Sequence, residues 1–101
     1  MSNDARLPSR TELIVLNFLA QKREMYGLEL VRVSNNKLKR GTIYVLLSRL
    51  EDKGFVSSRQ ISDIGVSGLP KRVYSITGLG QRAISASQQV EIILSYGLPA
   101  T

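Results

Sequence analysis

The clearest helical pattern in the chain lies in residues 40–54, RGTIYVLLSRLEDKG. Its apolar side chains recur at the spacing of one helix face, at Ile43, Leu46, Leu47 and Leu50. Gly54 follows them and suits the left-handed position that ends many helices. The spacing therefore predicts a helix over residues 40–53, with one side facing the core and the opposite side exposed.

Two further helices are expected before this segment. Ser9 and Glu12 have the spacing of a capping box, so the first helix begins at Ser9 and continues to about Lys22. A second, short helix is expected over residues 27–33. The run Ser34-Asn35-Asn36 then predicts a turn, because these side chains bond to nearby backbone groups.

A change of period after Gly54 indicates a β-hairpin. Residues 55–61 and the β-branched and aromatic run 72–76 are predicted as strands, and 62–70 is predicted as a loop because it contains two glycines and a proline. Thr77 can cap a last helix. Its apolar residues form a heptad-like seam at Leu79, Ala83, Ala86, Val90 and Ile93. Two heptads leave open whether this seam joins a second copy or packs on its own domain.

Length and composition exclude several classes of protein. The 101 residues suffice for one domain with a modest core, and they include neither Cys nor His. Disulfide scaffolds, thiolate or imidazole metal sites and the usual nucleophilic triads are thereby excluded. Glu51 and Asp52 are adjacent and diverge on a helix, so they cannot act as a paired acid and base. We expect no enzyme, no cofactor and no metal.

Nothing in the sequence indicates export or membrane insertion. No apolar run is long enough to span a membrane, and the N-terminus lacks the apolar segment of a signal peptide. A cytoplasmic protein is expected.

The basic residues are concentrated in the middle of the chain. The formal net charge is +6, and residues 37–82 hold nine basic side chains against three acidic ones. A localised basic surface attracts polyanions, of which nucleic acid is the commonest. Two other interpretations stay open, namely a solvated basic face and a surface that binds an acidic protein partner.

The order helix, helix, helix, hairpin, helix is that of a winged helix-turn-helix domain, mainly α with a small β-hairpin. In this fold the third helix enters the major groove of DNA and the hairpin, or wing, reaches the flanking backbone or minor groove. Residues 40–53 are the predicted recognition helix and residues 55–76 the predicted wing. The predicted division of the chain is a flexible arm (residues 1–8), the winged-helix domain (9–78), a C-terminal helix for dimerisation (79–96) and a tail (97–101).

The residues predicted to contact DNA lie on the exposed side of the third helix and at the base of the wing. They are Lys39, Arg40, Thr42, Tyr44, Val45, Ser48, Arg49, Lys71 and Arg72. Thr42 and Ser48 suit hydrogen bonds to base edges or backbone, and Val45 suits a thymine methyl group. Lys71 and Arg72 suit phosphates.

Two of these residues have a second interpretation. The Tyr44 hydroxyl could reach a phosphate, or its ring could pack against the first helix. Arg49 could contact DNA, or it could pair with Asp52 three residues later on the helix surface.

Short segments spread over residues 13–80 share the pattern of one family. They are Tyr26-Gly27-Leu28-Glu29-Leu30, Gly41-Thr42-Ile43-Tyr44, Leu47, Arg49-Leu50-Glu51, Gly54, Arg72, Tyr74, Ile76-Thr77 and Gly80. With them the chain resembles the PadR-like family of winged-helix transcriptional regulators. The resemblance implies a prokaryotic, phage or plasmid DNA-binding regulator, usually a homodimer and often a repressor. A symmetric dimer would bind an inverted repeat in double-stranded DNA.

The chain departs from the family pattern in two ways. Lys39-Arg40 stands where members commonly carry Ser-Pro, which loses an N-cap and places two cations at the positive end of the helix. We hypothesise that DNA phosphate neutralises them. Longer members also carry an extended C-terminal dimerisation region. A dimer of this chain is therefore expected to use residues 79–96 and the first helix, and a small-molecule effector has no support in the sequence.

Overall fold

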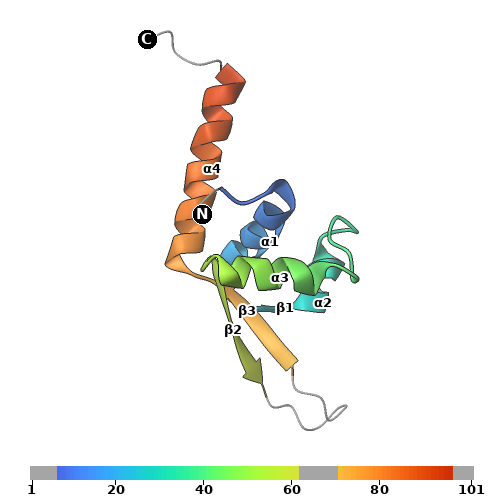
Figure 1. The fold of residues 1–101 in the computed structure, drawn as a ribbon. Helices are drawn as coiled ribbons and strands as arrows, with labels where there is room; N and C mark the ends of the chain where they lie inside the picture. The colour runs from blue at the N-terminus through green and yellow to red at the C-terminus, as the bar shows by residue number, and fades with distance from the viewer. Residues whose placement is uncertain (1–6, 62–70, 97–101) are drawn as a thin grey trace.

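The computed structural model describes the backbone of residues 7–61 and 71–96, and the side chains of the same residues up to 88. Within these ranges the elements are α1 (Arg10–Gln21), β1 (Met25–Tyr26), α2 (Gly27–Val33), α3 (Ile43–Asp52), β2 (Val56–Ile61), β3 (Lys71–Ile76) and α4 (Gly78–Tyr96). In Figure 1, α3 crosses the front of the body, and the hairpin of β2 and β3 points away from it. The predicted winged-helix class, mainly α with a small β-hairpin, is confirmed.

The first helix begins at the predicted capping box. The Ser9 hydroxyl accepts from the Glu12 amide at 3.1 Å, and the Glu12 carboxylate accepts from the Ser9 amide at 2.9 Å. Two backbone donors that a helix start leaves without partners are thereby satisfied. The helix then buries Val15, Leu16 and Leu19 against the rest of the domain.

The third helix confirms the predicted buried face and corrects the predicted start. The four residues of the predicted apolar face, Ile43, Leu46, Leu47 and Leu50, are all buried. The prediction placed the first turn at residue 40, but residues 40–42 form a turn and the helix begins at Ile43. The Lys39 carbonyl accepts from the amide of Ile43 at 2.9 Å, so that turn leads directly into the helix.

The end of α3 has the geometry of a Schellman motif. Gly54 adopts φ +83°, and its amide donates to the Glu51 carbonyl at 3.0 Å. The amide of Phe55 donates to the Leu50 carbonyl at 2.9 Å. This pair of bonds satisfies carbonyls at the helix end and turns the chain into β2.

The hairpin gains a third strand that the sequence pattern did not predict. The sheet order is β1-β3-β2, all antiparallel, and Met25 and Tyr26 of β1 pair with Tyr74 and Val73 of β3. A two-residue strand has no periodicity of its own, so only the pairing across the fold reveals it. The strand attaches the wing to the segment between α1 and α2.

The beginning of the last helix packs on the rest of the domain. The Thr77 hydroxyl accepts from the Gly80 amide at 3.0 Å and donates to the Gly54 carbonyl at 2.7 Å, which fixes the helix start to the end of α3. Gly80 lies against the Phe55 carbonyl, where a Cβ atom would come within 2.3 Å of the oxygen. The later turns of α4 extend beyond the other elements in Figure 1.

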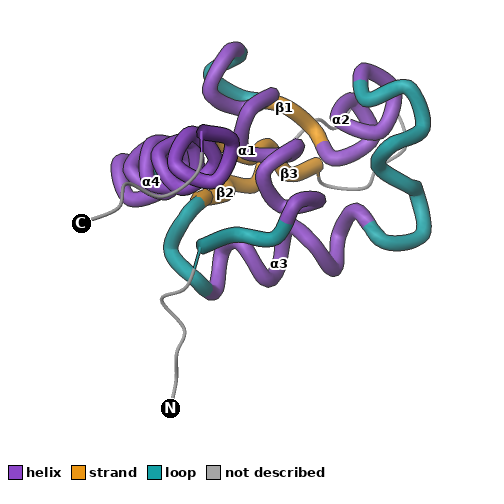
Figure 2. Tube along the Cα trace, turned by 90° about the horizontal axis from the view of Figure 1, so that it is seen from above, coloured by secondary structure: helices purple, strands orange, loops and turns teal. Residues whose placement is uncertain are grey.

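One apolar core joins these elements. Figure 2 shows the strands near the centre, with α2, α3 and α4 around them. The fully buried apolar side chains, with at most 1% exposure, are Val15, Leu16, Leu19, Met25, Leu30, Leu38, Ile43, Leu47 and Leu50. Among the described residues, no helix is long and apolar enough to cross a membrane. The predicted arm up to residue 6, the wing loop 62–70 and the tail 97–101 lie outside the described residues.

Candidate nucleic-acid interface

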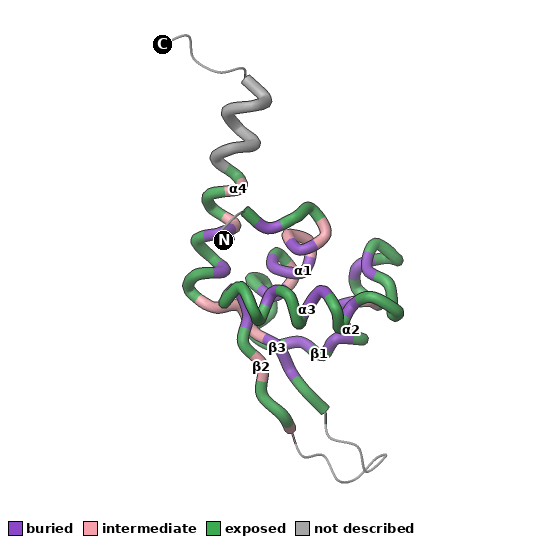
Figure 3. The backbone as a smooth tube through the Cα atoms, in the orientation of Figure 1, coloured by how far each residue is buried: buried purple, intermediate pink, exposed green. Residues whose placement is uncertain are grey.

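The outer side of α3 carries the side chains predicted to meet DNA. Thr42, Tyr44, Val45, Ser48 and Arg49 are all exposed, while the apolar residues between them point into the core. Figure 3 shows this alternation of buried and exposed positions along α3. Val45 is 53% exposed. The helix thus presents a hydroxyl, a branched aliphatic group and a guanidinium on one surface.

The Tyr44 ring lies against the start of the second helix. A Cβ atom at Gly27 would lie 2.7 Å from a carbon of the Tyr44 ring, so the ring rests directly on the first residue of α2. Its exposure is nevertheless 50%. Because Gly27 has no side chain, the Tyr44 ring can pack against the backbone at this position, and the outer face of the ring stays in solvent.

A groove runs from α2 past Tyr44 to the beginning of β3. Its volume is about 770 Å³, and its walls include three tyrosines and three cations, namely Tyr26, Tyr44, Tyr74, Arg32, Lys71 and Arg72. Burial raises the pKa of Tyr74 above its usual value. The Lys71 ammonium lies 5.5 Å from the centre of the Tyr26 ring, within range of a cation–π contact. The groove brings the base of the wing and the start of α3 to one surface.

The residues of α2 in this groove were not among the predicted site residues. Arg32 and Leu28 lie four positions apart, on the side of α2 away from the buried Leu30, and Leu28 is 45% exposed. An exposed leucine beside an exposed arginine on a short helix was the available signal. It is weak, because single exposed apolar residues are common on protein surfaces.

Two of the basic residues in the central stretch are used inside the fold. Lys53 binds Glu12 at 2.8 Å, and Arg59 binds both carboxylate oxygens of Glu24 at 2.8 and 2.9 Å. The Arg59 guanidinium holds the pKa of Glu24 below its usual value. Lys53 thus neutralises a buried carboxylate, whereas the pair of Arg59 and Glu24 lies at the surface, with side chains 61% and 40% exposed.

The other predicted cations are exposed. They are Lys39, Arg40, Arg49, Lys71 and Arg72. Among the described residues no ion pair involves any of them, so the alternative pairing of Arg49 with Asp52 does not form there. Their positive charge is open to solvent around α3 and the wing.

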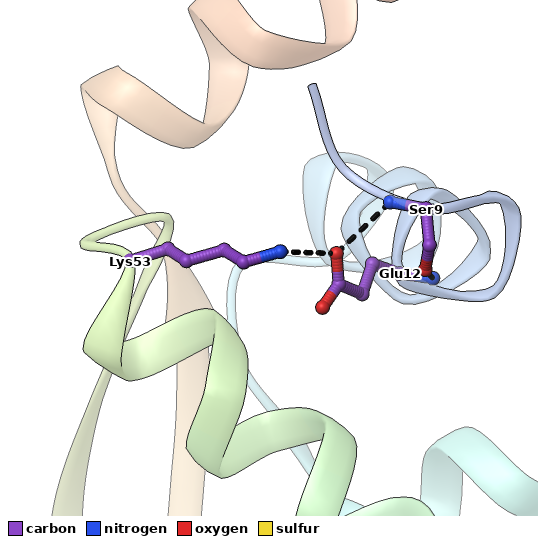
Figure 4. Close-up of polar contacts among 3 residues, drawn as sticks. All are labelled: Ser9, Glu12 and Lys53. Carbon is purple, nitrogen blue, oxygen red and sulfur yellow. Dashed lines mark hydrogen bonds and ion pairs between the residues drawn. The ribbon is translucent and has the colours of Figure 1, made fainter. Parts of the chain in front are cut away.

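The Glu12–Lys53 pair connects the start of α1 to the end of α3. Figure 4 shows the Lys53 side chain reaching across to the carboxylate that also accepts from the Ser9 amide. The Glu12 side chain is only 3% exposed. Burial raises its pKa, but the Lys53 and Ser9 hydrogen bonds outweigh this effect and leave the pKa lowered. The carboxylate therefore stays ionised at neutral pH and links the start of α1 to the end of α3.

A second polar network connects the end of α3 to the wing. The Ser58 hydroxyl of β2 donates to the Glu51 carboxylate at 2.7 Å. The same hydroxyl oxygen accepts from the Arg72 guanidinium of β3 at 2.9 Å. Helix and both wing strands are thus joined through one serine.

The predicted dimer residues occupy different environments. Leu79 is 44% exposed, and Ala86 is exposed as well. Ala83 is only 8% exposed and belongs to the core of its own chain. Val90 and Ile93 lie outside the residues whose side chains are described.

Comparisons with known proteins agree with this architecture. The model of the PadR-like family of transcriptional regulators matches residues 15–86. Among curated proteins none matches the chain significantly. A PadR family regulator from Eggerthella lenta is 26% identical, with a TM-score of 0.68 over 87% of this chain and 79% of that one.

Two further solved structures share the fold. A PadR family regulator from Clostridium difficile is 23% identical, with a TM-score of 0.68 over 87% of this chain and 98% of its own. The PadR protein of Bacillus subtilis, solved in complex with operator DNA, is 23% identical with a TM-score of 0.68. That match covers 76% of this chain but only 45% of the Bacillus protein. Since the family model spans most of the chain and the fold agrees, the chain belongs to the PadR-like family of transcriptional regulators.

Proposed function

We propose that the protein binds double-stranded DNA sequence-specifically, with α3 in the major groove and the hairpin of β2 and β3 along the flanking backbone. The observation that carries the proposal is the shared surface of α3 and the wing. Tyr44, Lys71 and Arg72 line one groove there, and Val45 and Arg49 stay exposed on the same helix as Tyr44. A major groove accommodates a helix with such an outer face, and base edges are read from it.

The division of roles follows from chemistry and position. Thr42, Ser48 and Arg49 supply hydrogen bonds to bases or backbone, and Val45 supplies contact with a thymine methyl group. Lys71 and Arg72, at the base of the wing, neutralise phosphates. Tyr44, whose ring packs against Gly27, presents its outer edge to the DNA backbone.

Lys39 and Arg40 complete the phosphate contacts. Both are exposed, and they precede α3 at its positive end, where two cations are unfavourable unless an anion lies nearby. A DNA phosphate at this position would neutralise them. The operator complex of the Bacillus subtilis relative supports DNA as the ligand of this fold.

We further propose that the protein acts as a homodimeric repressor on an inverted repeat. The dimer would form through residues 79–96, where Leu79 and Ala86 are exposed and α4 extends beyond the domain. A two-fold axis would place the two copies of α3 about one helical turn of DNA apart, or a small multiple of it.

Selection from a random pool of double-stranded DNA at near-physiological salt tests the proposal. We expect an enriched inverted repeat. Binding that selects no sequence and disappears as salt rises would overturn sequence-specific binding and favour a module that binds an acidic protein partner.

Charge-removing variants then test the assigned phosphate contacts. Lys39→Ala, Arg40→Ala and Lys71→Ala should each weaken binding to every duplex and reduce the slope of log affinity against log salt by about one. Lys37→Ala is the matched control, since Lys37 lines a separate hollow beside α1. Equal effects of Lys37→Ala and Lys71→Ala would contradict the assignment.

A further inference from the structure

The polar network of Glu51, Ser58 and Arg72 is built at a place where packing does not require it. Glu51 and Arg72 are exposed and Ser58 is half-buried, so water could satisfy all three side chains. The network nevertheless joins three separate elements through contacts of 2.7 and 2.9 Å. Holding an exposed arginine in one rotamer costs side-chain entropy, which this arrangement must offset.

Strand register places Ser58 and Arg72 on the same face of the wing. Gln60 pairs with Arg72, and Ser58 pairs with Tyr74. Residues two apart on one strand share a face, so Ser58 and Arg72 are diagonal neighbours there. Ser57 and Ser75 pair on the opposite face and form a hydroxyl contact of their own at 3.2 Å. The opposite face also carries an arginine, Arg59, but its guanidinium binds the Glu24 carboxylate instead of a serine hydroxyl.

The direction of the hydrogen bonds strengthens the arginine contact. Ser58 donates its only hydroxyl proton to the Glu51 carboxylate, so its oxygen is left to accept from the guanidinium. A hydroxyl polarised by a carboxylate is a better acceptor, because hydrogen bonds in a chain reinforce one another. Glu51 lies too far for an ion pair with Arg72 and acts on it through the serine.

We propose that Glu51 and Ser58 are positioning residues that hold Arg72 ready for a DNA phosphate. The inference rests on the DNA-binding function proposed above. Arg72 uses one N–H on Ser58, and a guanidinium has further donors to offer to a phosphate. Because the side chain is already ordered, DNA binding does not have to order it.

The test compares Ser58→Ala with Ser57→Ala, on a duplex obtained by selection from a random pool. Immobilising a flexible side chain on binding costs about 0.5–1.5 kcal/mol. Ser58→Ala should therefore weaken binding about twofold to twelvefold and lower the salt slope toward that of Arg72→Ala. Ser57→Ala removes a serine hydroxyl from the adjacent position and should leave affinity and slope unchanged. Ser58→Thr keeps the hydroxyl and should restore binding to within about twofold of the wild type.

A double-mutant cycle separates positioning from general loss of structure. In the Arg72→Ala background, Ser58→Ala should have no further effect, since the side chain that it positions is gone. An equal loss in both backgrounds, or an equal loss for Ser57→Ala and Ser58→Ala, would overturn the inference. A wild-type protein that binds no duplex would overturn the DNA-binding function itself, a different result from a wild type that binds and a Ser58→Ala variant that binds equally well.

Discussion

Replacing Lys53 by methionine should destabilise the domain through a carboxylate that loses its partner. Methionine keeps most of the apolar stem and removes the ammonium group that contacts Glu12 at 2.8 Å. The Glu12 side chain, 3% exposed, would then retain the hydrogen bond from the Ser9 amide at 2.9 Å. One bond from a backbone amide compensates only part of the desolvation of a carboxylate.

The size of the effect is bounded from both sides. Loss of one hydrogen bond between charged groups costs about 1.5–3 kcal/mol. The upper bound is set by protonation, because a carboxyl of ordinary pKa 4.5 can be neutralised at pH 7 for about 3.4 kcal/mol, at about 1.36 kcal/mol per pH unit. We therefore expect Lys53→Met to lower the free energy of unfolding by roughly 1.5–3.5 kcal/mol at pH 7.

The pH dependence distinguishes this mechanism from loss of packing. The folded-state pKa of Glu12 is lowered, so the contribution of the pair is present above about pH 4.5 and is lost as the pH falls through the folded pKa. The difference in free energy of unfolding between the wild type and Lys53→Met should therefore become smaller at acidic pH. Glu12→Gln combined with Lys53→Met should recover part of the loss, because no charge is then buried.

Urea unfolding at pH 7 and at acidic pH measures both effects, since a domain of this size is expected to unfold in one step. Lys22→Met is the matched control: Lys22 is 62% exposed and lies 3.8 Å from Glu29, so its loss should change stability by less than about 0.5 kcal/mol. The reasoning fails if Lys53→Met resembles this control at pH 7, or if its deficit is the same in acid.

Two glycines give further predictions. Gly27→Ala should displace the Tyr44 ring, because the added Cβ would lie 2.7 Å from it, and the affinity for DNA should fall. The free energy of unfolding should change little, because alanine favours the helix more than glycine does and offsets part of the strain. Gly41→Ala is the control in the same binding assay, because nothing lies within 4 Å of the Cβ that it adds. An equal loss of affinity in both variants would contradict a role for the contact between Tyr44 and Gly27. Gly80→Ala should lower the free energy of unfolding by roughly 1–3 kcal/mol in urea titrations, because the Cβ would meet the Phe55 carbonyl at 2.3 Å; an unchanged unfolding midpoint would show that α4 can move away without cost.

The elements with a strong local signal were predictable from the sequence. The capping box at Ser9, the apolar face of α3 and the left-handed Gly54 all depend on neighbours within a few residues. The same holds for the turn at Asn35 and Asn36, where both backbones adopt positive φ. Local hydrogen bonding and periodicity set these features, and the remainder of the fold follows from packing them together.

Features that depend on distant residues were not predictable in the same way. Strand β1 exists because Met25 pairs with Tyr74, far along the chain. The contact of Tyr44 with Gly27 and the groove that Arg32 shares with the wing arise from the packing of α2 beside α3. Residue spacing in the sequence does not predict which side chains meet there, because these side chains belong to different elements.

A count of the basic residues overstates the number of cations in the proposed DNA-binding surface. Residues 37–82 hold nine basic side chains, but Lys53 and Arg59 are bound within the fold, and five are left among the predicted DNA contacts. Since each neutralised phosphate contributes about 0.9 to the salt slope, five contacts predict a slope of about −4.5 per protomer, and nine would predict about −8. Titrations of a selected duplex at several salt concentrations measure this slope. A value near −8 would mean that DNA displaces Glu12 or Glu24 from its partner or contacts basic residues outside the predicted set.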